Sequence, residues 1–215
     1  LDISFGSSGM VKGEKIIKTL KDLVGDQLIE DLPITYTAVA SDIRNEKEIW
    51  LNEGPLFDAI RASISLPLFF TPARLNDVEL LDGGILNPVP IAPTFSDDTD
   101  IKIAVNLGGP VDKHIAASSH NQHMQAEPDL MDRISHFIDV IQGERDEPGN
   151  STLGMLDIAN QSFDAMQGAI ARQKLAAYPP DEIIELPRNL CGMLEFDRAE
   201  EMIETGYRLA AEKLT

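Results

Sequence analysis

Apolar and polar positions along the chain follow two different periods, which predict a mixture of helices and strands. Apolar residues three or four positions apart indicate amphipathic helices at 13–24, 56–63, 129–141, 153–178 and 197–214. Short apolar or β-branched runs bounded by turn-forming residues indicate strands at 34–40, 48–51, 78–81, 101–107 and 182–187. These segments predict a layered α/β fold, with a β-rich part over 1–110 and a mainly helical part over 111–215.

Three of these segments carry more specific expectations. The strand at 34–40 should end in a turn at Ser41-Asp42 and form a hairpin with 48–51. The near-continuous apolar run at 101–107 is typical of a parallel strand that is buried on both faces. The last helix begins at Asp197, with Glu200 placed as in a capping box. Its expected buried residues are Ala199, Met202, Ile203, Leu209 and Ala210.

The composition is that of one globular domain, with or without an appendage. The chain has 215 residues, of which 43% are hydrophobic and 25% are charged. Its net charge of −18 argues against nucleic-acid binding and against electrostatic docking on anionic membranes. No apolar run in the sequence has the length of a membrane span, so we expect no transmembrane segment; peripheral membrane contact stays open.

Cysteine and histidine residues offer little chemistry. Cys191 is the single cysteine, so no disulfide can form within the chain, and we predict a cytoplasmic location. His120 and His123 lie three residues apart, but no cysteine or clear carboxylate completes a metal-ligand set. We therefore interpret 114–128 as a loop or insertion, and expect no metal site.

Asp82-Gly83-Gly84, directly after the apolar run 78–81, is the first candidate for chemistry. An aspartate at a strand end, followed by two glycines that turn the chain, is held at the sheet edge, where functional residues are common. The same tripeptide also favours a β-hairpin turn, because Asp and Gly tolerate positive φ. On these three residues alone, the hairpin is the preferred interpretation.

A second motif upstream changes that interpretation. Residues 61–72 read Arg-Ala-Ser-x-Ser-x-Pro-x-x-Phe-x-Pro, and residues 82–90 read Asp-Gly-Gly-x-x-Asn-Pro-x-Pro. In this order and this close together, the two motifs resemble the patatin-like phospholipase family, most closely its bacterial members. The resemblance extends more weakly from about Met10 to Leu107.

The resemblance implies a lipid acyl hydrolase, a serine esterase of lipid metabolism that uses a Ser-Asp dyad and no cofactor. It also implies a mostly parallel central sheet flanked by helices. Asp82 matches the family's general base, and Arg61 is expected to have a structural partner. Ser63 and Ser65 have no adjacent histidine, so neither is interpreted as a nucleophile. The supporting motif comprises Gly83, Gly84, Arg61, Ser63, Pro67, Asn87 and Pro88.

The family's nucleophile motif, Gly-x-Ser-x-Gly, does not occur in the sequence. No serine has glycine at both i−2 and i+2, and Gly6-Ser7-Ser8-Gly9 has the wrong spacing. Because the chain also begins without Met, inside the family pattern, we expect it to be the C-terminal portion of one patatin-like domain. The parent protein would hydrolyse an acyl lipid or ester, and the chain without its N-terminal segment would be inactive.

Two alternatives stay open at this point. A non-catalytic patatin-like module would bind lipid or a partner without a nucleophile. An unrelated α/β domain would carry a chance hairpin at Asp82, with its carboxylate in solvent. The sequence specifies neither the acyl lipid nor the oligomeric state.

Overall fold

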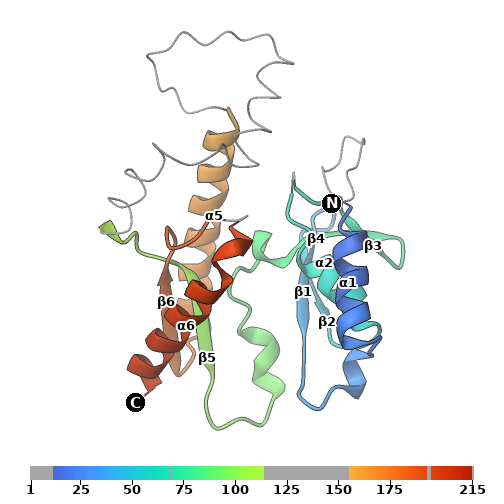
Figure 1. Ribbon diagram of the computed structural model, residues 1–215, viewed down its shortest axis with the longest axis horizontal. Helices are drawn as coiled ribbons and strands as arrows, with labels where there is room; N and C mark the ends of the chain where they lie inside the picture. The colour runs from blue at the N-terminus through green and yellow to red at the C-terminus, as the bar shows by residue number, and fades with distance from the viewer. Residues whose placement is uncertain (1–11, 68, 114–154, 193–194, 215) are drawn as a thin grey trace. The chain divides into compact units, whose positions relative to one another are not determined.

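The computed structural model describes residues 12–67, 69–113, 155–192 and 195–214 of the chain. The chain divides into two compact units, whose elements are labelled in Figure 1. The first unit comprises Leu1–Asn106 and Asp164–Ile184, and the second comprises Leu107–Phe163 and Glu185–Thr215. The first unit contains both motifs that the sequence singles out.

A four-stranded antiparallel sheet forms the base of the first unit. Its strands, in spatial order, are β2 (Lys47–Leu51), β1 (Ala38–Asp42), β4 (Val78–Asp82) and β3 (Ala73–Leu75). The turn between β3 and β4 has positive φ at Asn76 (48°) and Asp77 (63°), as a two-residue type I′ hairpin requires. All five residues of β1, which lies between β2 and β4, are buried.

Two α-helices and a 3-10 turn accompany this sheet. Ala62 of α2 (Leu56–Ser63) packs with Ala40 of β1 and Leu80 of β4. Helix α1 (Glu14–Val24) contacts α2 and ends where the N–H of Gly25 donates to the Lys21 carbonyl at 2.8 Å. Gly25 has φ 88°, a value that favours glycine at a helix end. The 3-10 helix η1 (Ile29–Asp31) adds Ile29 to the core.

The rest of the first unit is built from parts of α5, β5 and β6. Helix α5 spans Met155–Ala177, β5 spans Ile103–Gly109 and β6 spans Glu182–Pro187. The N–H of Asp181 donates to the Lys102 carbonyl and that of Arg188 to the Gly109 carbonyl, so β5 and β6 run parallel. The 3-10 helix η3 (Ala92–Ser96) precedes β5. The buried residues of this core are Val89, Ile91, Ala104 and Ala171.

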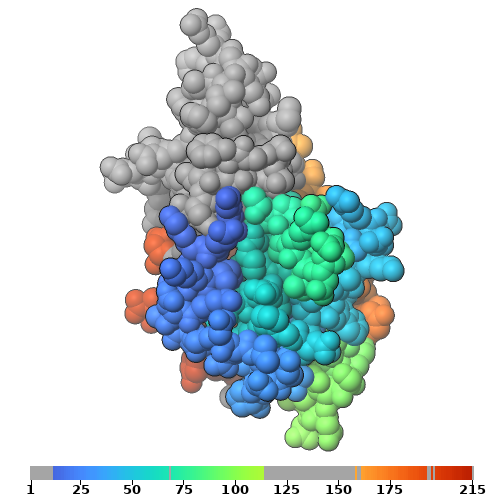
Figure 2. Space-filling view, turned by 90° about the vertical axis from the view of Figure 1, so that its right-hand side faces the viewer, coloured from blue at the N-terminus to red at the C-terminus, as the bar shows by residue number. Residues whose placement is uncertain are grey.

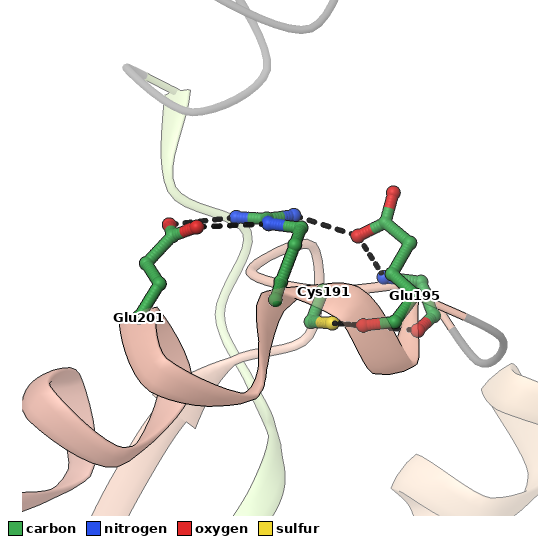
Figure 3. A network of polar contacts seen from close by, with 5 residues as sticks. Cys191, Glu195 and Glu201 are labelled. Atoms are coloured by element: carbon green, nitrogen blue, oxygen red, sulfur yellow. Dashed lines mark hydrogen bonds and ion pairs between the residues drawn. The ribbon is translucent and has the colours of Figure 1, made fainter.

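In the second unit, a polar network joins the segment that follows β6 to α6 (Ala199–Leu214), which comes after the 3-10 helix η4 (Phe196–Arg198). Arg198 donates to Glu195 at 2.6 Å and to both carboxylate oxygens of Glu201 at 2.7 and 2.9 Å (Figure 3). Burial, with a hydrogen bond to Glu195, raises the pKa of the Cys191 thiol in this network. The thiol is therefore a poor nucleophile.

The α/β class and most of the expected elements are confirmed. Three elements have boundaries that differ from the expected ones. Strand β1 begins at Ala38 and includes Ser41 and Asp42, because β2 extends the ladder to the pair Asp42 and Lys47. Strand β5 lies two residues later than expected, and α6 begins at Ala199 because Asp197 belongs to η4. The expected parallel pairing holds for β5 and β6. The four-stranded sheet is instead antiparallel, since short turns join β1 to β2 and β3 to β4.

Two expectations about burial are wrong. On β5, Ala104 and Asn106 are buried, whereas Val105 and Leu107 are 53% and 67% exposed, so the strand is covered on one face. No residue of α6 is buried, and Ile203 is 72% exposed. The spacing of apolar residues shows which face of a helix or strand is apolar, but it does not show whether another element packs on that face.

Several expected features fall outside the described residues: the loop at 114–128 with its histidines, the helix at 129–141, and the Gly6–Gly9 segment. In the described part of the chain, no helix combines the length and apolar character of a membrane span. The same residues contain no cluster of three potential metal ligands.

Candidate active site

Asp82 is the last residue of β4 and caps the turn that follows it. Its main chain pairs with Ala40 of β1, and its N–H donates to the Ser65 carbonyl at 2.9 Å. One carboxylate oxygen, Oδ1, accepts the N–H of Gly84 at 2.7 Å. The chain then enters the 3-10 helix η2 (Gly83–Ile85). The Asp-Gly-Gly segment is therefore a strand-to-turn corner, and the hairpin interpretation is wrong.

Close approach of other segments explains both glycines. A Cβ on Gly83 would lie 2.2 Å from the carbonyl oxygen of Val39, which is backbone of the central strand β1. A Cβ on Gly84 would lie 2.8 Å from the amide nitrogen of Gln167 in α5 and 2.9 Å from Oδ1 of Asp82. The turn is thus packed between β1 and α5. Main chain excludes a side chain at Gly83, whereas a side chain at Gly84 would displace the ends of the Gln167 and Asp82 side chains.

The environment of Asp82 disfavours its negative charge. Burial raises the pKa of the Asp82 carboxyl above its ordinary value, and the hydrogen bond from Gly84 opposes that rise only in part. Oδ2 accepts no hydrogen bond from a described residue, since the carboxylate is bonded by Gly84 alone. One oxygen is therefore anchored to the turn, and the other is available to accept a proton.

Arg61 joins three segments near this corner. Its guanidinium donates to the carbonyls of Lys12 at 2.6 and 2.9 Å and of Thr71 at 2.8 Å, and to the Ser65 hydroxyl at 2.6 Å. It also lies over the Phe70 ring, 5.3 Å from the centroid. Arg61 therefore has the structural partners expected for it.

Ser65 is placed as a structural residue. Its side chain is fully buried, and its hydroxyl donates to the Arg61 carbonyl at 2.7 Å. Through its own carbonyl it also holds the Asp82 N–H, so Arg61, Ser65 and Asp82 form one connected path. Ser63 ends α2 and is half-buried, as are Pro67 and Pro88 in the loops.

Asn87 closes the turn that begins at Asp82. Its N–H donates to the Gly83 carbonyl at 2.9 Å, and its side-chain amide donates to Glu48 of β2 at 3.0 Å. Glu48 in turn pairs with Lys174 of α5. Sequence reasoning missed Glu48, Lys174 and Gln167, because their contacts with the motif span tens of residues and no local pattern signals them.

A groove of about 590 Å³ lies between α1 and the segment 71–75, which are dark blue and cyan to green in Figure 2. Lys18 and Arg74 contribute charge to its lining, and Ile17 and Leu75 contribute apolar surface. Asp82 is not among its lining residues. The groove and the carboxylate are therefore separate features of the first unit.

Comparisons with known proteins agree with the two motifs. A family model described as patatin-like phospholipase matches residues 1–95. An uncharacterized NTE family protein of Mycobacterium bovis is 35% identical over 259 aligned residues, which cover 100% of this chain and 72% of that protein. The chain belongs to the patatin-like phospholipase family.

Two further relatives are longer proteins, of which the aligned region is a small part. A patatin-like phospholipase domain-containing protein of Caenorhabditis elegans is 38% identical over 94 residues, 42% of this chain and 7% of that protein. The lysophospholipase NTE1 of Pyricularia oryzae is 24% identical over 214 residues, 100% of this chain and 13% of that protein. The family and these relatives support lipid hydrolysis as the general activity.

Proposed function

We propose that this patatin-like protein is a carboxylic ester hydrolase of acyl lipids, a phospholipase A-like enzyme with a Ser-Asp dyad. Asp82 would be the general base. The observation that supports this role is its carboxylate at the end of β4, with Oδ1 held by Gly84 and Oδ2 without a partner among the described residues. Burial raises the pKa of this carboxyl, which makes it a stronger base than an exposed aspartate.

The proposed reaction requires one base, Asp82, and one serine hydroxyl. Oδ2 takes the proton of a serine hydroxyl as the serine oxygen bonds to the acyl carbonyl carbon. The proton then passes to the leaving alcohol, and an acyl-enzyme remains. Water then attacks the acyl carbonyl carbon and gives a proton to the same carboxylate. The bond between the acyl group and the serine oxygen breaks, the proton returns to that oxygen, and the fatty acid is released. No redox step occurs, so no organic cofactor is required.

The serine of this proposal lies outside the 215 residues. No serine in the sequence has the glycine spacing of the nucleophile motif. Ser65 commits its hydroxyl proton to Arg61, and Ser41 is fully buried with its hydroxyl 3.5 Å from the Gly83 carbonyl. We therefore expect the 215-residue chain by itself to be inactive. A cytoplasmic location remains part of the proposal.

The substitution Asp82→Asn in the full-length protein tests this function. The asparagine side chain can still accept the Gly84 N–H, so the corner should keep its geometry, but a neutral amide cannot take a proton. We expect kcat for ester hydrolysis to fall by about 10²- to 10⁴-fold, measured with a panel of acyl esters and phospholipids.

The matched control for this test is Glu79→Gln on the same strand. It removes a carboxylate that makes an exposed ion pair with Arg44, and it should leave kcat unchanged. Full activity in D82N would remove Asp82 from the mechanism. Absence of ester hydrolysis in the wild-type protein would instead favour a non-catalytic lipid- or partner-binding module.

A further inference from the structure

A partly buried ion pair lies next to the Asp82 turn. Glu48 of β2 accepts from the ammonium of Lys174 with one oxygen, Oε1. Its other oxygen, Oε2, accepts from the side-chain amide of Asn87 at 3.0 Å and from the Trp50 indole at 3.3 Å. The side chains of Glu48 and Lys174 are only 20% and 29% exposed, whereas each other ion pair described in the first unit has a partner that is at least 77% exposed.

The hydrogen-bond partners of Glu48 stabilise its ionised form. Burial disfavours its ionised form, but the hydrogen bonds from Lys174, Asn87 and Trp50 outweigh burial and lower the pKa of this carboxyl. The carboxylate therefore remains an acceptor on both oxygens at neutral pH. It can hold a cation of α5 and an amide of the turn at the same time.

The contact with Glu48 leaves Asn87 with an unpaired atom. The residue is 3% exposed, and its Oδ1 has no hydrogen-bond partner among the described residues. The ionised carboxylate of Glu48 can accept hydrogen bonds but cannot donate them. The Asn87 amide must therefore turn its nitrogen, and not its oxygen, toward Glu48 in β2. An unpaired buried acceptor is unfavourable, which indicates that the bond to Glu48 decides the orientation of this side chain.

Asn87 is connected to Asp82 through the hydrogen bonds of one short turn. The N–H of Asn87 donates to the Gly83 carbonyl at 2.9 Å, and the Ser41 hydroxyl lies 3.5 Å from the same oxygen. Gly83 follows Asp82 directly, and Gly84 binds the Asp82 carboxylate. A path of contacts thus runs from Lys174 through Glu48 and Asn87 to the turn that orients the proposed base.

We propose that Glu48 and Lys174 are positioning residues for Asp82, which lock the Asp82–Asn87 turn between β2 and α5. This proposal rests on the proposed function, since a positioned base matters only if Asp82 acts as one. Neither residue touches a substrate or takes a proton in this account. Their effect is geometric: a displaced turn moves the carboxylate from the serine that it serves.

Three variants of the full-length protein separate positioning from general stability. In Glu48→Gln one carboxylate oxygen becomes an NH2 donor, so the side chain cannot accept at both places, because Lys174 and Asn87 bind different oxygens of Glu48. Lys174→Met removes the cation, and Lys174→Arg keeps it. We expect E48Q and K174M to lower kcat about 10- to 100-fold with little change in KM, and K174R to recover most of the loss.

Amide hydrogen exchange supplies a readout that does not depend on activity. We expect exchange across residues 82–88 to become about tenfold faster or more in E48Q and K174M, with the thermal unfolding midpoint still above the assay temperature. The matched control is Glu79→Gln, which breaks the exposed ion pair to Arg44 and should change neither exchange nor kcat.

The outcomes distinguish failure of this proposal from failure of the proposed function. Exchange and kcat in E48Q equal to those of E79Q would overturn the positioning role, even with an active wild-type enzyme. A kcat loss that K174R does not recover would also overturn the role of Lys174. A wild-type protein without esterase activity would overturn the proposed function, and the exchange data would then decide by themselves whether Glu48 and Lys174 hold the turn.

Discussion

Asp82 combines two properties that oppose each other at the scale of a single residue. Its carboxylate is partly removed from water, and one hydrogen bond from Gly84 only partly compensates. A group whose charged form is disfavoured in the folded state reduces stability whenever it is ionised. The ionised carboxylate therefore lowers the stability of the folded state, while its raised pKa makes it a stronger base.

This balance predicts a pH-dependent stability difference between the wild type and D82N. Burial raises the pKa of Asp82 above its ordinary value near 4, so the folded state binds more protons than the unfolded state above that pH. The contribution of Asp82 to stability is therefore fully present below about pH 4 and is lost as pH rises through the folded-state pKa. An asparagine side chain does not titrate, so D82N should gain stability relative to the wild type over this window.

Urea unfolding of the two full-length proteins between about pH 4 and pH 8 measures this difference. The expected result is a midpoint difference that grows in favour of D82N with rising pH and then levels off. A constant difference across the range would show that the carboxyl has an ordinary pKa in the folded protein.

The sequence predicts a turn at Asp82, Gly83 and Gly84, because they form a contiguous motif with a turn signal, and the structure places Asn87 in the same turn. The sequence showed no sign of Glu48 and Lys174, which are 126 residues apart and read as ordinary charged residues of a strand and a helix. Buried polar contacts of this kind depend on tertiary packing.

At the scale of elements, Arg61 connects α2 to the segments on either side of it. Its planar group binds the carbonyl of Lys12, before α1, and that of Thr71, before β3. The same group holds the Ser65 hydroxyl, whose main chain binds Asp82. One side chain thereby fixes the path of the chain from the end of α2 to β3.

Arg61→Lys should lower the free energy of unfolding although it keeps the charge. A lysine ammonium cannot reproduce the fork that reaches several carbonyls at once. Losing hydrogen bonds from a charged donor should cost about 1.5–3 kcal/mol. Urea unfolding of the full-length protein measures the loss, with Arg44→Lys, at an exposed ion pair, as the matched control. An equal effect of both substitutions would contradict the connecting role of Arg61.

Helices and strands are predictable from the sequence where their own residues determine where they begin and end. Helix α1 has a clear apolar period and a glycine at its end, and α2 begins after Pro55. The sequence predicts an end of β1 that is two residues too early, because Ser41 and Asp42 are typical turn residues. Pairing with β2 keeps both residues in the ladder. The hairpin of β3 and β4 likewise depends on Asn76 and Asp77, two residues that tolerate positive φ.

At the scale of the whole molecule, the family match and the proposed site fall in the same part of the chain. The chain aligns over its full length with an NTE family protein, and a patatin-like phospholipase model matches residues 1–95, which contain Asp82 and the Arg61 segment. We propose that Asp82 activates a serine that lies outside these 215 residues. The pairing of these two residues can therefore be tested only in the full-length protein.

Covalent labelling with a fluorophosphonate ester tests the pairing of Asp82 with a serine. The reagent bonds to an activated serine hydroxyl, and peptide mapping by mass spectrometry identifies the labelled residue. We expect a single modified serine outside the 215 residues, and labelling in D82N at least about 100-fold slower than in the wild type. Labelling of a serine within this sequence, or equal labelling rates in the two proteins, would contradict the account.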